Sequence, residues 1–291
     1  SDYARDHGGR VVALSLPQVM SLRLNLTSGF IFDVLPEWAP VLALPMDERR
    51  RAFADPATRK RLAEGASSPE AGPIGFLATW ENMTIAETFN PGNEGLVGRN
   101  LGEVARERDK TPFDMFCDLS LEEDMRTSFS PFIPGDDEES WKLRAEVWQD
   151  PRVVVGGSDA GAHLDMIDTF ACATSLLGPA CRDRGLIKLE EAVHQLTDVP
   201  ARLYGIKERG RLAEGWAADI CIFDPETVGP GQLHTRCDLP SGAARLYAES
   251  SGIEHVVVGG VETVRSGGLT GEHAGRILRS GTDTETVRAS A

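Results

Sequence analysis

Residues 156–163, with the sequence GGSDAGAH, carry the residue types best suited to chemistry. They follow the apolar, β-branched run of residues 153–155, which predicts a buried strand. An acidic residue, Asp159, therefore comes at the end of a strand among small residues, and α/β barrels form their active sites at that end. Asp159 is a candidate general base or metal-adjacent carboxylate. The structural alternative is that it caps the N-terminus of a following helix.

The neighbours of Asp159 offer less chemistry by themselves. His163 either contacts a substrate or satisfies a buried loop. Ser158 invites comparison with a nucleophile elbow, but GxSxG requires a glycine where Ala160 stands, so a serine hydrolase is not favoured. The 6 histidines form no HxH or HExxH pair, and a hydrolytic metal needs several converging ligands. The sequence therefore does not support a self-contained zinc site.

The composition places the chain among ordinary globular proteins, with 41% hydrophobic and 26% charged residues in a length of 291. Its formal net charge of -15 would repel a phosphate backbone, so we expect no nucleic-acid partner. No run approaches the ~20 apolar residues that cross a bilayer, so we expect no membrane partner. The 5 cysteines lack CxxC spacing, which is typical of reduced residues in a cytosolic protein.

The elements that must position Asp159 follow an α/β pattern. The runs at residues 10–16 and 152–157 predict buried strands. Apolar residues at i, i+3, i+4 and i+7 predict helices over residues 164–177 and 189–203. Strands followed by amphipathic helices are typical of α/β proteins.

Other segments predict supporting structure. Residues 45–65 contain a second helix start at Asp55-Pro56, so they predict two short helices. Residues 75–80 predict a strand. Past residue 205 glycines cluster and the runs 218–224 and 255–264 predict a small β module, with a hairpin turning at Gly259-Gly260.

Two motifs together resemble the amidohydrolase superfamily, in its branch of N-acyl-D-amino-acid deacylases (D-aminoacylases). GGSDAGAH at residues 156–163 looks like the signature that follows the eighth barrel strand of this family. GRLAEGWAADICIFDP at residues 210–225, after ARLYG at 201–205, looks like the return into the small β-sandwich that flanks the barrel. IEHVVV at 253–258 is similar to the closing hairpin. The resemblance spans nearly the whole chain but only the later part of the family's full length.

The resemblance implies an α/β fold, the C-terminal part of a TIM-like (β/α)8 barrel with a small flanking β-sandwich domain. Residues 1–204 would form the last part of the barrel with a helical insertion. Residues 205–291 would form the sandwich and a C-terminal tail.

The resemblance also implies the chemistry: a metal-dependent hydrolase that cleaves a C–N amide bond. A zinc ion would polarise the amide carbonyl and activate water, while Asp159 would shuttle the proton to the leaving amine. Asp159 is also a possible metal ligand. Ser158, Gly161 and His163 would bind the small-molecule substrate. The favoured substrate is an N-acyl-D-amino acid. A hydantoin-like cyclic amide and a non-catalytic scaffold or regulatory role are the alternatives.

The remaining metal ligands of the family belong upstream of these motifs. Its HxH motif, its metal-bridging residue and its two mid-barrel histidines have no counterpart in this sequence. A few parallel strands with open edges cannot close a barrel. We therefore expect an N-terminal companion chain that carries the HxH and mid-barrel ligands and completes a heterodimer with zinc as its cofactor.

Overall fold

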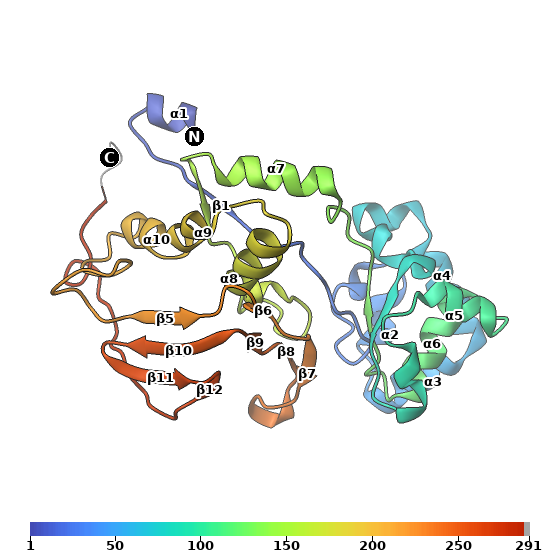
Figure 1. Ribbon diagram of the computed structural model, residues 1–291. Coiled ribbons are helices and arrows are strands. Elements are labelled where there is room, and N and C mark those ends of the chain that lie inside the picture. Colours follow the sequence, from blue (N-terminus) through green and yellow to red (C-terminus); the bar gives the residue numbers. More distant parts are fainter. Residues whose placement is uncertain (288–291) are drawn as a thin grey trace. The chain divides into compact units, whose positions relative to one another are not determined.

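The chain folds into a mixed α/β structure of two compact units, which a computed structural model describes over residues 1–287 (Figure 1). The first unit combines residues 1–20, 134–164 and, within the described part of the chain, 168–287. The second unit consists of residues 21–133 with residues 165–167. The predicted barrel, sandwich and domain boundary at residue 204 stay predictions.

The first unit contains a two-stranded parallel sheet, a series of helices and a group of antiparallel strands. Its helices are α1 (Asp2–Asp6), α7 (Glu138–Trp148), η5 (Thr169–Ala171), α8 (Cys172–Ser175), η6 (Leu176–Asp183), α9 (Leu189–Leu196), α10 (Asp198–Leu203) and η7 (Pro240–Gly242). Its strands are β1 (Ala13–Ser15), β4 (Val153–Val155), β5 (Ile220–Phe223), β6 (Gly229–Pro230), β7 (His234–Arg236), β8 (Arg245–Tyr247), β9 (Ser250–Ser251), β10 (Ile253–Val258), β11 (Val261–Arg265) and β12 (Gly268–Leu269).

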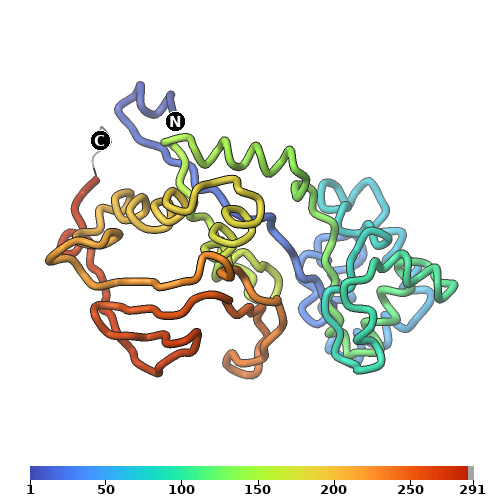
Figure 2. The backbone as a smooth tube through the Cα atoms, in the orientation of Figure 1, coloured from blue at the N-terminus to red at the C-terminus, as the bar shows by residue number. Residues whose placement is uncertain are grey.

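The β module predicted past residue 205 is confirmed. Its main sheet has the strand order β12-β11-β10-β5, with all neighbours antiparallel, and the chain doubles back through it in Figure 2. The hairpin between β10 and β11 turns at Gly259 and Gly260, whose φ angles are 57° and 86°. Two consecutive positive φ angles are the requirement of the tight hairpin turn that glycine pairs favour.

The second unit is built from short helices around an aromatic core. Its elements are η1 (Phe32–Val34), α2 (Trp38–Leu42), α3 (Met46–Ala54), α4 (Pro56–Ala66), η2 (Pro69–Ala78), η3 (Trp80–Asn82), β2 (Thr84–Glu87), η4 (Pro91–Leu96), α5 (Leu101–Glu107), α6 (Pro112–Glu122) and β3 (Ser128–Ser130). The two helices predicted within residues 45–65 are confirmed as α3 and α4. Asp55 separates them, and its carboxylate accepts a hydrogen bond of 2.9 Å from the backbone N–H of Thr58.

The two ends of the second unit lie side by side. Leu24 and Phe129 form an antiparallel bridge. The hydroxyl of Ser130 donates a hydrogen bond of 2.6 Å to the carbonyl of Leu22. The segment that enters this unit is therefore paired with the segment that leaves it.

The strand predicted over residues 75–80 is wrong. The segment lies in the two 3-10 helices η2 and η3, and Gly72, with φ 57° and ψ -148°, divides η2 before Pro73. Leu77 and Trp80 are 1% and 6% exposed, so their apolar character comes from burial in the helical core. Each described helix is too short or too polar to span a membrane.

Candidate active site

The parallel pair of β1 and β4 presents the GGSDAGAH loop. The register aligns Ala13 with Val153 and Ser15 with Val155, so both strands point the same way. Beyond β4, the backbone N–H groups of Gly156 and Gly157 donate hydrogen bonds of 3.1 and 3.3 Å to the carbonyl of Ser15. The loop therefore begins at the carboxyl ends of two adjacent strands, as the sequence predicts.

The loop of residues 158–163 is a series of tight turns. Asp159, Gly161 and His163 have positive φ angles of 50°, 96° and 45°. The backbone N–H of Ala160 donates a hydrogen bond of 3.2 Å to the Ser158 hydroxyl. The hydroxyl of Thr169, beyond the loop, donates a hydrogen bond to the Ser158 carbonyl. Non-glycine residues in this conformation are uncommon and concentrate at functional sites.

Two sequence expectations around the loop are wrong. Asp159 does not cap a helix, because its left-handed backbone continues into turns. The helix predicted over residues 164–177 begins late, at η5 with Thr169, and continues through α8 into η6. Pro179 lies inside η6, which has the wider π-helical form, and proline cannot supply the N–H that an α-helix needs there.

The four predicted site residues lie together on this loop. Asp159 is exposed, and its carboxylate has no hydrogen bond or ion pair with any residue from 1 to 287. His163 and Gly161 are also exposed, and a Cβ placed on Gly161 would meet no atom within 4 Å. Ser158 is half-buried. The loop thus exposes one carboxylate and one imidazole and carries a half-buried hydroxyl, and the carboxylate can accept a proton.

The described residues do not by themselves fit the zinc ion that the resemblance implies. Within residues 1–287, no group of three or more His, Cys, Asp or Glu side chains is placed to hold a metal ion. A catalytic zinc site takes three protein ligands, and this loop brings a single candidate, Asp159.

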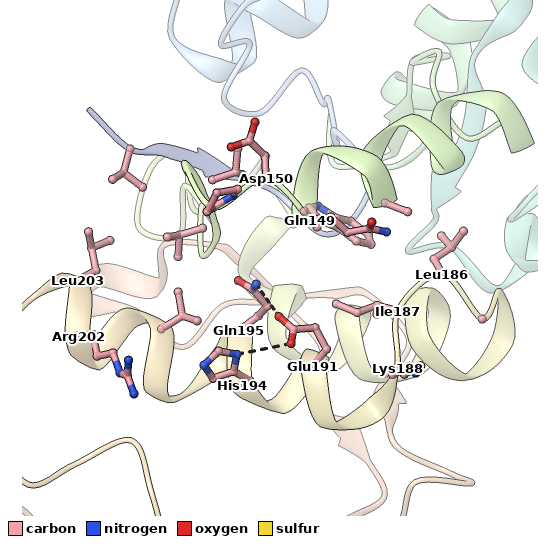
Figure 3. Close-up of a pocket in the computed structure, with 18 of the residues that line it drawn as sticks. Gln149, Asp150, Leu186, Ile187, Lys188, Glu191, His194, Gln195, Arg202 and Leu203 are labelled. Carbon is pink, nitrogen blue, oxygen red and sulfur yellow. Dashed lines mark hydrogen bonds and ion pairs between the residues drawn. The ribbon is translucent and has the colours of Figure 1, made fainter. Parts of the chain in front are cut away.

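A cavity of about 890 Å³ in the first unit lies apart from this loop. Its lining comes from the residues before β1, from α7, β4, α9 and α10, and from the segment before α9, and includes none of residues 156–163. Three of its polar lining residues, Lys188, Glu191 and Gln195 (Figure 3), were not among the site residues predicted from sequence. Their i, i+3, i+7 spacing marks one helical face and could have indicated that they line a common surface.

Comparison with known proteins supports the motif assignment. Residues 134–264 match the Amidohydrolase family. The resemblance to the amidohydrolases is thereby confirmed. A D-aminoacylase from Alcaligenes xylosoxydans xylosoxydans is 31% identical over 185 residues, which are 63% of this chain and 34% of the relative. An N-acyl-D-glutamate deacylase from the same organism is 39% identical over 122 residues, covering 42% of this chain and 22% of the relative.

A crystal structure of D-aminoacylase is similar with a TM-score of 0.42 and 28% sequence identity, covering 70% of this chain and 38% of that chain. The aligned part of this chain spans about a third or less of the two curated relatives, 34% and 22%. The amidohydrolase match includes β4 and the whole GGSDAGAH loop. The segment that matches the amidohydrolases is therefore the same segment that places Asp159 at the carboxyl end of β4.

Proposed function

We propose that this chain is one part of an amidohydrolase that hydrolyses the C–N amide bond of a small molecule, with an N-acyl-D-amino acid as the favoured substrate. The observation that carries the proposal is the exposed Asp159, held on a strained loop at the carboxyl end of β4 inside the segment that matches the amidohydrolases. The relatives named D-aminoacylase and N-acyl-D-glutamate deacylase support the substrate class.

In this proposal Asp159 carries a proton between water and the leaving group. Its carboxylate accepts a proton as the water oxygen attacks the amide carbon, and it returns that proton to the nitrogen as the C–N bond breaks. The products are a carboxylic acid and an amine. Ser158, Gly161 and His163 lie on the same loop as Asp159, so in this proposal they would contact the substrate beside the scissile bond.

The surroundings of β1 support a companion polypeptide. Leu14, in the middle of β1, is 55% exposed, although its register partner Val154 is 6% exposed. Parallel sheets are ordinarily covered on both faces. We propose that an N-terminal companion covers this pair in a cytoplasmic heterodimer and brings the HxH and mid-barrel histidines that would hold zinc.

Native and denaturing mass spectrometry of the purified protein, with elemental analysis for zinc, tests the assembly. A second polypeptide with about one or two zinc ions per pair is the expected result. A folded, monomeric, metal-free chain would overturn the companion.

Activity is then measured on the same preparation with N-acetyl-D-methionine, its L enantiomer and hydantoin. Release of D-methionine with little turnover of the other two supports the proposed substrate. Preferential opening of hydantoin would make the protein a cyclic amide hydrolase instead. No turnover of any of the three by the zinc-containing pair would favour a scaffold or regulatory role.

A further inference from the structure

The Asp159 side chain makes no contact that could fix its carboxylate. The residue is exposed, and the carboxylate has no hydrogen bond or ion pair with any residue from 1 to 287. A general base must nevertheless lie within hydrogen-bond reach of the proton that it removes. The direction of the Asp159 Cα–Cβ bond comes from the backbone, so the groups that hold this backbone decide where the carboxylate can lie.

Both peptide groups beside the Asp159 Cα accept a hydrogen bond. On the C-terminal side, the Asp159 carbonyl accepts a bond of 3.1 Å from the backbone N–H of Ala162. On the N-terminal side, the Ser158 carbonyl accepts a bond from the hydroxyl of Thr169. Because each carbonyl lies in the plane of its peptide group, the two bonds restrain the φ and ψ angles of Asp159. The φ angle is 50°, in the left-handed region that is unfavourable for an L-residue.

Of these two donors, only Thr169 lies outside the loop of residues 158–163. Thr169 begins η5 and is 1% exposed, so its side chain is held inside the first unit. A buried hydroxyl without a partner is costly, which favours the side-chain conformation that reaches Ser158. The contribution of one hydrogen bond and the cost of one left-handed residue are of the same order. Loss of this bond is therefore enough to release the turn at Asp159.

We propose that Thr169 is a positioning residue for Asp159. Its hydroxyl holds the Ser158–Asp159 peptide group in the left-handed turn from which the carboxylate reaches the substrate. This role rests on the hydrolysis proposed above, because it affects turnover only where Asp159 carries the proton. A misplacement of about 1 Å can cost on the order of a hundredfold in rate, so a released turn impairs catalysis although Thr169 itself touches no substrate.

Two substitutions of Thr169, made in the full protein with any companion and metal that it carries, test this role. Valine has nearly the shape of threonine without the hydroxyl, whereas serine keeps the hydroxyl. Thr169→Val should lower kcat for the amide substrate by about ten- to a hundredfold with KM changed by no more than about twofold, and Thr169→Ser should keep most of the activity. An unchanged kcat in Thr169→Val, or an equal fall in Thr169→Ser, would overturn the proposal.

The matched control is Thr263→Val on β11. It also removes a threonine hydroxyl that donates to a backbone carbonyl, that of Val256, at 3.2 Å. Both kcat and KM should stay at the parent values in this variant. A fall of kcat as large as in Thr169→Val would mean that any such loss impairs the enzyme, which overturns the specific role of Thr169.

A double-mutant cycle separates positioning from a general loss of structure. In the Asp159→Asn background, Thr169→Val should change the remaining turnover by no more than about twofold, because the carboxylate that it positions is absent. A further fall as large as in the parent protein would show that Thr169 acts independently of Asp159, and the proposal would be wrong.

Amide hydrogen exchange, followed residue by residue by NMR, tests the anchor without a substrate. Thr169→Val should speed the exchange of the Ala160 and Ala162 N–H groups several-fold, whereas the Gly156 N–H, which donates to the Ser15 carbonyl, should keep its rate. Thr169→Ser should resemble the parent protein. Unchanged exchange at Ala160 and Ala162 in Thr169→Val would overturn the anchor.

Two further results have a defined meaning. Where the valine variant does not fold, Thr169→Ala compared with Thr169→Ser gives the same contrast, since these two variants differ only in the hydroxyl. No turnover by the parent protein would contradict the proposed hydrolysis, and the exchange rates would still decide whether Thr169 holds the loop.

Discussion

The second unit and the β1–β4 pair of the first unit bury their apolar residues to different extents. In the second unit, Trp38, Phe32 and Phe116 are 0% exposed. The rings of Trp38 and Trp80 stack with centroids 5.7 Å apart, and Phe116 packs 4.8 Å from Trp80. In β1, by contrast, Leu14 is 55% exposed. The unit rich in aromatic residues supplies its own core, whereas the strand pair that presents the candidate chemistry leaves apolar surface for something else to cover.

Enzymatic activity should respond most strongly to a change at Asp159, which follows the carboxyl end of β4. Asp159→Asn should lower turnover of the proposed substrate by a factor on the order of 10²–10⁴, because the amide cannot carry the proton. Asparagine also tolerates a positive φ, so the melting temperature should hardly move. Steady-state kinetics and thermal unfolding on one preparation check this, with Glu254→Gln, an exposed carboxylate on β10, as control. A parallel fall of stability and turnover would make Asp159 structural.

Two truncations to alanine measure the difference in burial between the aromatic core and β1. Phe116→Ala removes a ring at the centre of the aromatic core and should lower the free energy of unfolding by about 3–5 kcal/mol. Leu14→Ala should change it by no more than about 0.5 kcal/mol in the chain alone. Urea unfolding measures both. Equal losses would mean that β1 is as well packed as the aromatic core.

A smaller effect depends on pH and belongs to the second unit. Burial raises the pKa of Asp118, but hydrogen bonds and charges from Lys110 and Arg59 outweigh it and hold that pKa below its ordinary value. Nη2 of Arg59 lies 2.7 Å from the carboxylate. A lowered folded-state pKa contributes stability above the unfolded-state value of about 3.9, and this stability is lost as pH falls through the folded-state pKa.

The measurement compares the parent protein with Asp118→Asn by urea unfolding between about pH 6 and pH 2.5. The parent should lose more stability than the variant over this range, because only the parent carries the carboxylate whose pKa is lowered in the folded state. Identical pH profiles would show that Asp118 has the same pKa in the folded and unfolded chains.

The smallest effect contrasts two glycines that both have room for a methyl group. Gly161, on the site loop, has a φ of 96°, and a Cβ added there or at Gly95 would meet no atom within 4 Å. Gly161→Ala should cost about 1 kcal/mol because the backbone is strained for an L-residue, whereas Gly95→Ala should be neutral or slightly stabilising. Thermal unfolding of the two variants decides whether the loop holds its left-handed form. No loss in Gly161→Ala would mean that the loop relaxes freely.

Local chemistry made much of this structure predictable. Asp55-Pro56 marks a cap and a first-turn proline, so α3 and α4 follow from sequence alone. Gly259-Gly260 between β-branched runs predicts the hairpin for the same reason. The strand before Asp159 was predictable because residues 153–155 are all valine.

The predictions that the structure contradicts failed because they depend on contacts between residues far apart in sequence. Residues 75–80 contain strand-like apolar residues, but burial against the aromatic core explains them as well as a strand would. Nothing in the spacing around Asp159 distinguishes a helix cap from a series of left-handed turns, since Asp suits both. The buried Oε1 of Gln195, which has no hydrogen-bond partner among the described residues, also could not be predicted, because its burial depends on how α9 packs beside β4.

The pairing of the second unit's two ends has a consequence for the order of folding. Ala13 and Val153 must meet although the whole second unit lies between them in sequence, and closing such a long loop carries an entropic cost that grows with its length. Once Leu24 has joined Phe129, that loop becomes two short tethers. The long-range closure is therefore made within the second unit, where Leu24 meets Phe129, and the docking of β1 onto β4 adds only the closure of the segments between these contacts.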